Sequence, residues 1–208
     1  DFSAEMERTL QVLDYAILVI SGTDGVQAHT ETLWQLLARY NIPTFLFINK
    51  MDLPGADRAA VLAELNSRLS EGCLPLDELG EEAAMCSEEL MSEYLEQGTM
   101  STAALARAVR RRELFPCCFG SALRLEGVDE FLSLLSTCTL LPDYPEEFGA
   151  RVYKVSRDGQ GNRLTWLKIT GGALRPKTML SGVTNGEAWS EKADQLRVYS
   201  GAKFTPAD

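Results

Sequence analysis

At 208 residues the chain is long enough for one large domain or two small ones. Its composition, 45% hydrophobic and 24% charged with a net charge of −10, is ordinary for a soluble globular protein. No apolar run approaches the roughly 20 residues that cross a bilayer and no signal peptide opens the chain, so we expect a cytoplasmic protein without a membrane partner.

The first 70 residues alternate between helical and strand-like patterns. Apolar residues at helical spacing predict a helix over 3–13, and the β-prone run at 16–20 predicts a strand. A helical stripe after Thr30 is followed by a buried strand over 43–48 and then by a helix over 61–69. This alternation with short joints predicts a parallel sheet covered by helices on both faces.

Residues 71–112 interrupt the alternation. Residues 71–96 contain nine Asp/Glu and no Lys or Arg, with a sparse apolar stripe, and the segment closes on Arg110–Arg112. The pattern predicts a mostly helical insertion on the surface of the first domain. Its acidic run is either a solvated face or, alternatively, a surface on which another protein docks.

A third strand is predicted over Leu114–Phe119, followed by a helix that begins at Gly127-Val128. The first domain then covers residues 1–141, and residues 142–147, with two prolines and three acids, form a linker.

From residue 148 the apolar period changes to two. Strands are predicted over Ala150–Ser156, Leu164–Thr170, Thr178–Val183 and Glu191–Tyr199. Residues 148–208 therefore form an antiparallel β domain of small-barrel type, which we expect to be incomplete. They carry ten Lys/Arg and five Asp/Glu, which makes this part the better candidate for contact with a phosphate backbone; ordinary variation of surface charge is the alternative.

The five cysteines include no C-x-x-C pair, and the chain has a single His. These numbers predict no zinc site and favour free, mostly buried thiols in a reducing compartment.

Polar motifs follow two of the predicted strands. Asn49-Lys50-Met51-Asp52 comes directly after the strand at 43–48, and in open parallel sheets ligands bind at the carboxyl ends of strands. An N-K-x-D tetrad there is typical of guanine recognition, because its carboxylate can accept hydrogen bonds from N1–H and the exocyclic amine of guanine. Adenine lacks that donor pair, so binding it would leave buried polar groups unpaired. The alternative is a capping turn in which Asn49 and Asp52 accept bonds from backbone donors.

Gly120-Ser121-Ala122-Leu123 stands at the end of the next long strand. A backbone N–H in such a loop can donate to the guanine carbonyl, and small side chains permit a close approach. Together the motif-bearing segments resemble the translational GTPases, in the elongation factor G branch and closest to the tetracycline-resistance ribosomal protection proteins. The matching segments are 1–8, 24–30, 49–52 and 120–123, with 89–96 and 114–116 pointing to the branch.

The resemblance covers essentially the whole chain and implies a role for each residue of the tetrad and of the second loop. Asp52 would pair with the guanine edge, Asn49 would brace the loop near N7, and Lys50 would lay its methylene stem over the ring. Ala122 would offer its N–H to the carbonyl, and Ser121 would steady the loop and Asp52. Leu123 replaces the commoner Lys and can still cover the base.

The same resemblance implies a fold and a partial mechanism. The fold would be a partial P-loop GTPase domain, α/β with a mostly parallel sheet, followed by a partial antiparallel β-barrel. The chain contains no G-x-x-x-x-G-K-[ST], and the switch segments with the catalytic histidine would precede Asp1. We therefore expect a fragment with no catalytic residue and no Mg²⁺ ligand, which binds GTP weakly or not at all and does not hydrolyse it.

The intact protein would bind GTP or GDP with Mg²⁺ and hydrolyse GTP on the ribosome as a monomer, in contact with ribosomal RNA and ribosomal proteins. Its task would be tetracycline protection or translocation. The alternatives are a release-factor-type GTPase, a GTPase outside translation, and a non-enzymatic module that binds the ribosome or RNA.

Overall fold

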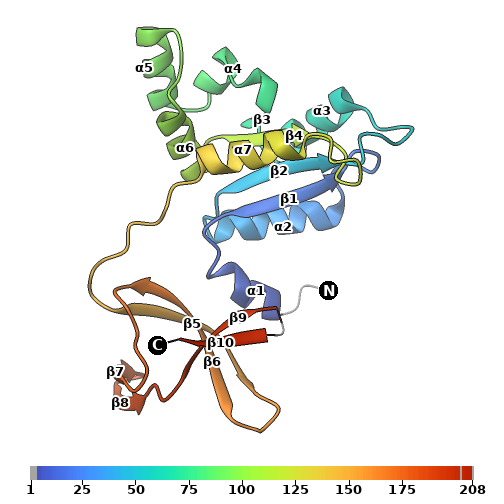
Figure 1. Ribbon diagram of the computed structural model, residues 1–208. Helices are drawn as coiled ribbons and strands as arrows, with labels where there is room; N and C mark the ends of the chain where they lie inside the picture. The colour runs from blue at the N-terminus through green and yellow to red at the C-terminus, as the bar shows by residue number, and fades with distance from the viewer. Residues whose placement is uncertain (1–3, 202, 208) are drawn as a thin grey trace. The chain divides into compact units, whose positions relative to one another are not determined.

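The computed structural model describes residues 4–201 and 203–207 (Figure 1). The chain divides between Pro142 and Asp143 into two compact units, each of which is described by itself. No helix in the described part of the chain has the length and apolarity that a membrane span requires.

The first unit is built on a four-stranded sheet in the order β1-β2-β4-β3, with every neighbouring pair parallel. Its elements in chain order are α1 (Ala4–Leu10), β1 (Ala16–Ser21), α2 (Ala28–Arg39), β2 (Thr44–Asn49), α3 (Arg58–Arg68), β3 (Cys73–Pro75), the 3₁₀ turn η1 (Leu76–Glu78), α4 (Glu81–Ala84), α5 (Glu88–Gln97), α6 (Thr102–Arg110), β4 (Phe115–Phe119) and α7 (Val128–Cys138).

Strand β2 contributes to two separate cores because successive side chains of a strand point to opposite faces. Phe45 and Phe47 lie in the core beneath α6 and α7, where their rings are 6.5 and 5.2 Å from that of Phe131. Leu46 and Ile48 lie in the other core, with residues of α2 and α3. Helices α2 and α7 accordingly cover opposite faces of the sheet (Figure 1).

The helices of residues 71–112 have their own terminal signals. The hydroxyl of Ser87 accepts from Leu90 N–H at 3.2 Å at the start of α5, and that of Ser101 accepts from Ala104 N–H at 3.1 Å at the start of α6. Gly98 ends α5 with a left-handed φ of 71°.

This segment differs from the expectation of a superficial insertion. Helix α6 buries Ala104, Ala108 and Val109 in the core that it shares with α7, so that part of the segment supports the sheet. Strand β3 was not predicted, because three residues that include a proline show no strand period.

The second unit consists of three antiparallel strand pairs, β5–β6, β7–β8 and β9–β10. Their bounds are β5 (Gly149–Arg157), β6 (Arg163–Gly171), β7 (Met179–Thr184), β8 (Glu187–Lys192), β9 (Leu196–Ser200) and β10 (Lys203–Ala207).

One predicted strand of this unit is wrong. Residues Glu191–Tyr199 do not form a single strand, because β8 ends at Lys192 and the chain turns at Ala193, whose N–H bonds to Thr178 O at 2.9 Å. Strand β10 was also missed. The fold class itself is confirmed: an α/β unit with a parallel sheet is followed by a unit of several antiparallel sheets, consistent with a barrel-like domain.

All five cysteines are free, and all except the half-buried Cys86 are buried, as the sequence predicted.

Candidate functional site

The two motif loops are neighbours because β2 and β4 are adjacent and parallel. The strand register pairs Ile48 with Phe119, so the chain leaves both strands at the same edge of the sheet. Backbone bonds continue past the strands: Gly120 N–H donates to Ile48 O at 2.9 Å, and Met51 N–H donates to Gly120 O at 3.1 Å. The sheet itself therefore brings the tetrad and the second loop together.

Asn49 is the polar centre of the two loops. Its Oδ1 accepts from the backbone N–H of Lys50 at 2.8 Å and from that of Ala122 at 2.9 Å. Lys50 adopts a left-handed φ of 65°, which is unfavourable for a residue other than glycine, and its side chain is exposed. The bond from its own N–H to Asn49 helps to hold Lys50 in this conformation.

The second loop is closed on itself. Ser121 is buried, and its N–H and C=O exchange 3.0 Å hydrogen bonds with Glu126. A Cβ on Gly120 would collide with Glu126 O, so the closure requires glycine at that position. Leu123 projects into solvent with 92% of its surface exposed.

The carboxylate of Asp52 is paired with an arginine. Arg124 Nε lies 3.1 Å from Asp52 Oδ2, and the Asp52 side chain is only 9% exposed whereas that of Arg124 is 60% exposed. Sequence reasoning missed Arg124, although an arginine directly after the Ser121–Leu123 segment is a signal that could have pointed to it.

A third loop, after β1, supports the tetrad from beneath. Gly22 N–H donates to Asn49 O at 2.7 Å, and a Cβ on Gly22 would lie 2.5 Å from Met51 Sδ. The absence of a side chain at Gly22 therefore lets the third loop approach the tetrad closely.

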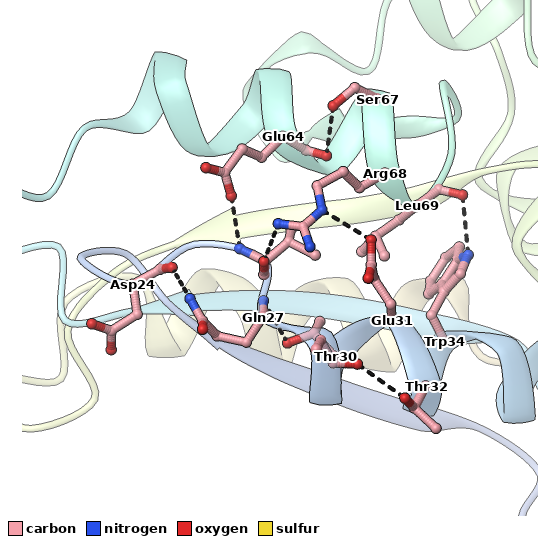
Figure 2. Close-up of polar contacts among 12 residues, drawn as sticks. Asp24, Gln27, Thr30, Glu31, Thr32, Trp34, Glu64, Ser67, Arg68 and Leu69 are labelled. Atoms are coloured by element: carbon pink, nitrogen blue, oxygen red, sulfur yellow. Dashed lines mark hydrogen bonds and ion pairs between the residues drawn. The ribbon is translucent and has the colours of Figure 1, made fainter.

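Side chains of α3 also bind the loop that follows β1 (Figure 2). Glu64 Oε2 accepts from Val26 N–H at 2.8 Å, and Arg68 donates both to Val26 O and, at 2.9 Å, to Glu31 Oε1. Both backbone polar groups of Val26 thus have partners on one helix. The loop after β1 is thus bonded to the tetrad at Gly22 and to α3 at Val26.

Asn49 and Ala122 are joined by a hydrogen bond of 2.9 Å, and Asp52 is paired with Arg124 of the second loop. Ser121 lies in the same loop but is buried, and its backbone is paired with Glu126. Lys50 and Leu123 border the loops with exposed side chains.

Comparison with known proteins gives two findings. The family model described as "Elongation factor Tu GTP binding domain" matches residues 1–140. A crystal structure of a protein from Thermus thermophilus is similar in fold, with a TM-score of 0.75 and 22% sequence identity. The match covers 99% of this chain and 39% of that chain, so this chain spans about two fifths of the length of its structural neighbour.

Proposed function

This chain belongs to the elongation factor Tu GTP-binding domain family, and on that basis we propose that Asn49–Asp52 and Gly120–Leu123 recognise the guanine base of GTP and GDP. Membership gives the general type, a translational GTPase. The contacts that individual residues make with the base are our proposal.

The observation that carries the proposal is the double acceptance by Asn49 Oδ1, from Lys50 N–H and from Ala122 N–H. The bond from Ala122 N–H, 2.9 Å long, attaches the second loop directly to the first residue of the tetrad. A capping turn, the alternative for the tetrad, also has Asn49 accept from backbone donors, but it predicts donors in the same turn and not the N–H of Ala122 on a second loop, 73 positions away. The Asp52 side chain is nine-tenths buried and pairs with Arg124 of the second loop.

Each proposed contact follows from donor and acceptor chemistry. The Asp52 carboxylate accepts from N1–H and the exocyclic amine of guanine, and the Ala122 N–H exchanges its bond to Asn49 Oδ1 for one to the guanine carbonyl. Adenine presents an acceptor where guanine has N1–H, so it would face the carboxylate without a hydrogen bond to it, at a cost of about 1–3 kcal/mol. The Lys50 stem covers one face of the ring.

We propose that the intact protein hydrolyses GTP, as its family implies. The activity is assigned to the intact protein and not to this chain, which covers only 39% of the Thermus thermophilus structure. We place that protein in the elongation factor G branch, nearest the ribosomal protection proteins, on the segments 89–96 and 114–116. It would act on the cytoplasmic ribosome as a monomer. Co-sedimentation of the intact protein with ribosomes, strengthened by a non-hydrolysable GTP analogue, would support this role; indifference to the analogue would contradict it.

Magnesium is not assigned to residues of this chain. No group of three or more His, Cys, Asp or Glu residues in the described ranges could hold a metal ion. The GTP and GDP that the family binds carry Mg²⁺ in general.

The base contacts can be tested on the 208-residue chain by NMR titration, which detects millimolar affinities of about −4 kcal/mol. Guanosine is expected to shift the amide signals of Lys50 and Ala122, and adenosine is not. Asp52→Asn should reverse the preference toward xanthosine, because an amide can accept from N1–H and donate to the second carbonyl of xanthine.

The matched control is Asp77→Asn, since Asp77 also pairs with an arginine, Arg58 at 2.5 Å, but lies on η1. It should leave the preference for guanosine unchanged. Equal shifts from guanosine and adenosine, or no shift at these amides up to saturating guanosine, would refute the proposed site.

A further inference from the structure

We propose that Arg124 is a built-in competitor for guanine: its guanidinium occupies the Asp52 carboxylate that the base would use and thereby lowers the affinity of the site. The inference rests on the proposed function and adds its regulation. It assigns to Arg124 a role that neither the tetrad nor the second-loop motif contains.

The guanidinium of Arg124 resembles the edge of guanine that Asp52 would bind. The edge of guanine that Asp52 would bind is an N1–H beside an exocyclic amine on one carbon, which is itself a guanidine unit. Arg124 presents the same unit, with Nε 3.1 Å from Asp52 Oδ2. The arginine takes an acceptor position on Oδ2, so a base that binds both carboxylate oxygens has to displace the guanidinium or share Oδ2 with it.

The second base contact is also satisfied from within the protein. Ala122 N–H, the donor proposed for the guanine carbonyl, bonds to Asn49 Oδ1 at 2.9 Å. Guanine binding would therefore exchange existing hydrogen bonds for new ones, and such exchanges yield little net free energy. Both base contacts, Asp52 and Ala122 N–H, already have partners within the protein, so the net free energy of guanine binding is small. One ion pair can therefore change the affinity noticeably.

Arg124 can move without disturbing the core. Its side chain is 60% exposed, and its neighbours Leu123 and Leu125 are 92% and 71% exposed. The loop is closed beneath it by the bonds between Ser121 and Glu126, which do not involve the arginine side chain. Release of Asp52 thus needs only a rotation of one surface side chain.

The expected effect is modest and measurable. Ion pairs with one exposed partner change equilibria by about two- to five-fold, so Arg124→Gln should tighten guanosine binding by about that factor. Guanosine is neutral, so screening by salt acts on charges within the protein and not on an attraction between protein and ligand. In the wild-type chain salt screens the Arg124–Asp52 pair and should tighten binding, and in Arg124→Gln this dependence should vanish.

The experiment is an NMR titration with guanosine at low and high NaCl, followed at the amides of Lys50 and Ala122. Arg124→Lys keeps the charge and should keep the salt dependence. The matched control is Arg163→Gln, because Arg163 is 55% exposed and pairs with Glu191 at 2.8 Å in the second unit. It should leave both affinity and salt dependence unchanged.

The outcomes separate the two proposals. If guanosine shifts the site amides but Arg124→Gln binds no tighter, or binds more weakly, Arg124 is not a competitor and this inference fails alone. If the salt dependence persists in Arg124→Gln, the inference also fails. If guanosine shifts no site amide in either protein, the guanine site itself fails.

Discussion

Ala122 donates its backbone N–H to Asn49 Oδ1 at 2.9 Å, across 73 positions of the chain, and so joins the ends of two neighbouring strands through one side chain. Asn49→Ala would leave this N–H and that of Lys50 without their acceptor. We expect the free energy of unfolding to fall by about 1 kcal/mol, the low end for lost hydrogen bonds because Asn49 is only half-buried. Urea unfolding followed by far-UV circular dichroism reports it, since all helices of the described residues lie in the first unit.

The control for that substitution is Asn49→Asp, which keeps an acceptor oxygen at the same position. It should stay closer to the wild-type stability than Asn49→Ala does. Equal losses in both variants would mean that the amide nitrogen of Asn49, not its oxygen, matters for stability.

Gly25→Ala tests the contact between the loop after β1 and helix α3. Gly25 has a φ of +63°, and a Cβ there would collide with Glu64 Oε2, the acceptor for Val26 N–H. The control Gly98→Ala has a similar φ of +71° with nothing within 4 Å of its Cβ. Both should lose about 1–2 kcal/mol for the left-handed backbone, and Gly25→Ala should lose about 1 kcal/mol more as Glu64 is displaced.

The extra loss should shrink when Gly25→Ala is combined with Glu64→Ala, because the displaced carboxylate is then already absent. Urea unfolding of the two single variants and the double variant measures this coupling. Additive losses would show that Glu64 adapts without cost.

Glu89 gives the first unit an acid-sensitive contact. Its carboxylate lies 2.6 Å from Arg107, on α6, and 2.8 Å from Arg111, which directly follows α6. The hydrogen bond from Arg107 is the main cause that lowers the pKa of Glu89 below its ordinary 4.5. A lowered folded-state pKa means that the contribution is present above pH 4.5 and is lost as the pH falls through the lowered value. Glu89→Gln should therefore be less stable than wild type near pH 7, and the difference should close below pH 4.5.

Thermal unfolding of both proteins between pH 7 and 3 measures this difference. Glu88→Gln is the control, because Glu88 shares the first turn of α5 and hence the same helix dipole. A stability gap between wild type and Glu89→Gln that stays constant down to pH 3 would disprove the assignment.

The thiols should divide into one reactive group and four protected ones. Cys86 is half-buried whereas the other cysteines are buried. Burial raises the pKa of Cys86, so its reaction with a disulfide reagent should be slow at pH 7 and should accelerate with pH as the thiolate forms. Cys86→Ser should remove the phase that accelerates with pH before the buried thiols react; if that phase survives in Cys86→Ser, another cysteine is the more accessible one.

The sequence predicted the parallel sheet because its central strands are unbroken apolar runs. Residues 43–48 and 114–119 have side chains buried on both faces, and such strands stand out from their surroundings by composition alone. Their ends then located Asn49–Asp52 and Gly120–Leu123 without any knowledge of tertiary contacts.

Features that depend on a partner distant in sequence were not predictable in this way. Strand β3 exists because β4 offers it hydrogen bonds, not because Cys73–Pro75 has a strand pattern. The pairing of Asp52 with Arg124 depends on how the second loop closes on Glu126. The division of Glu191–Tyr199 likewise follows from the bond between Ala193 and Thr178, which no local pattern encodes.

Strand β2 places alternate side chains in two different cores, and packing in both cores fixes the register of the strand and hence the position of Asn49. Inserting or deleting a single residue before Asn49 would place Phe45 and Phe47 where Leu46 and Ile48 belong and would damage both layers at once. A strand shifted in register by one residue would therefore lose packing in both cores. The register of β2 thus fixes where Asn49–Asp52 begin at the end of the strand.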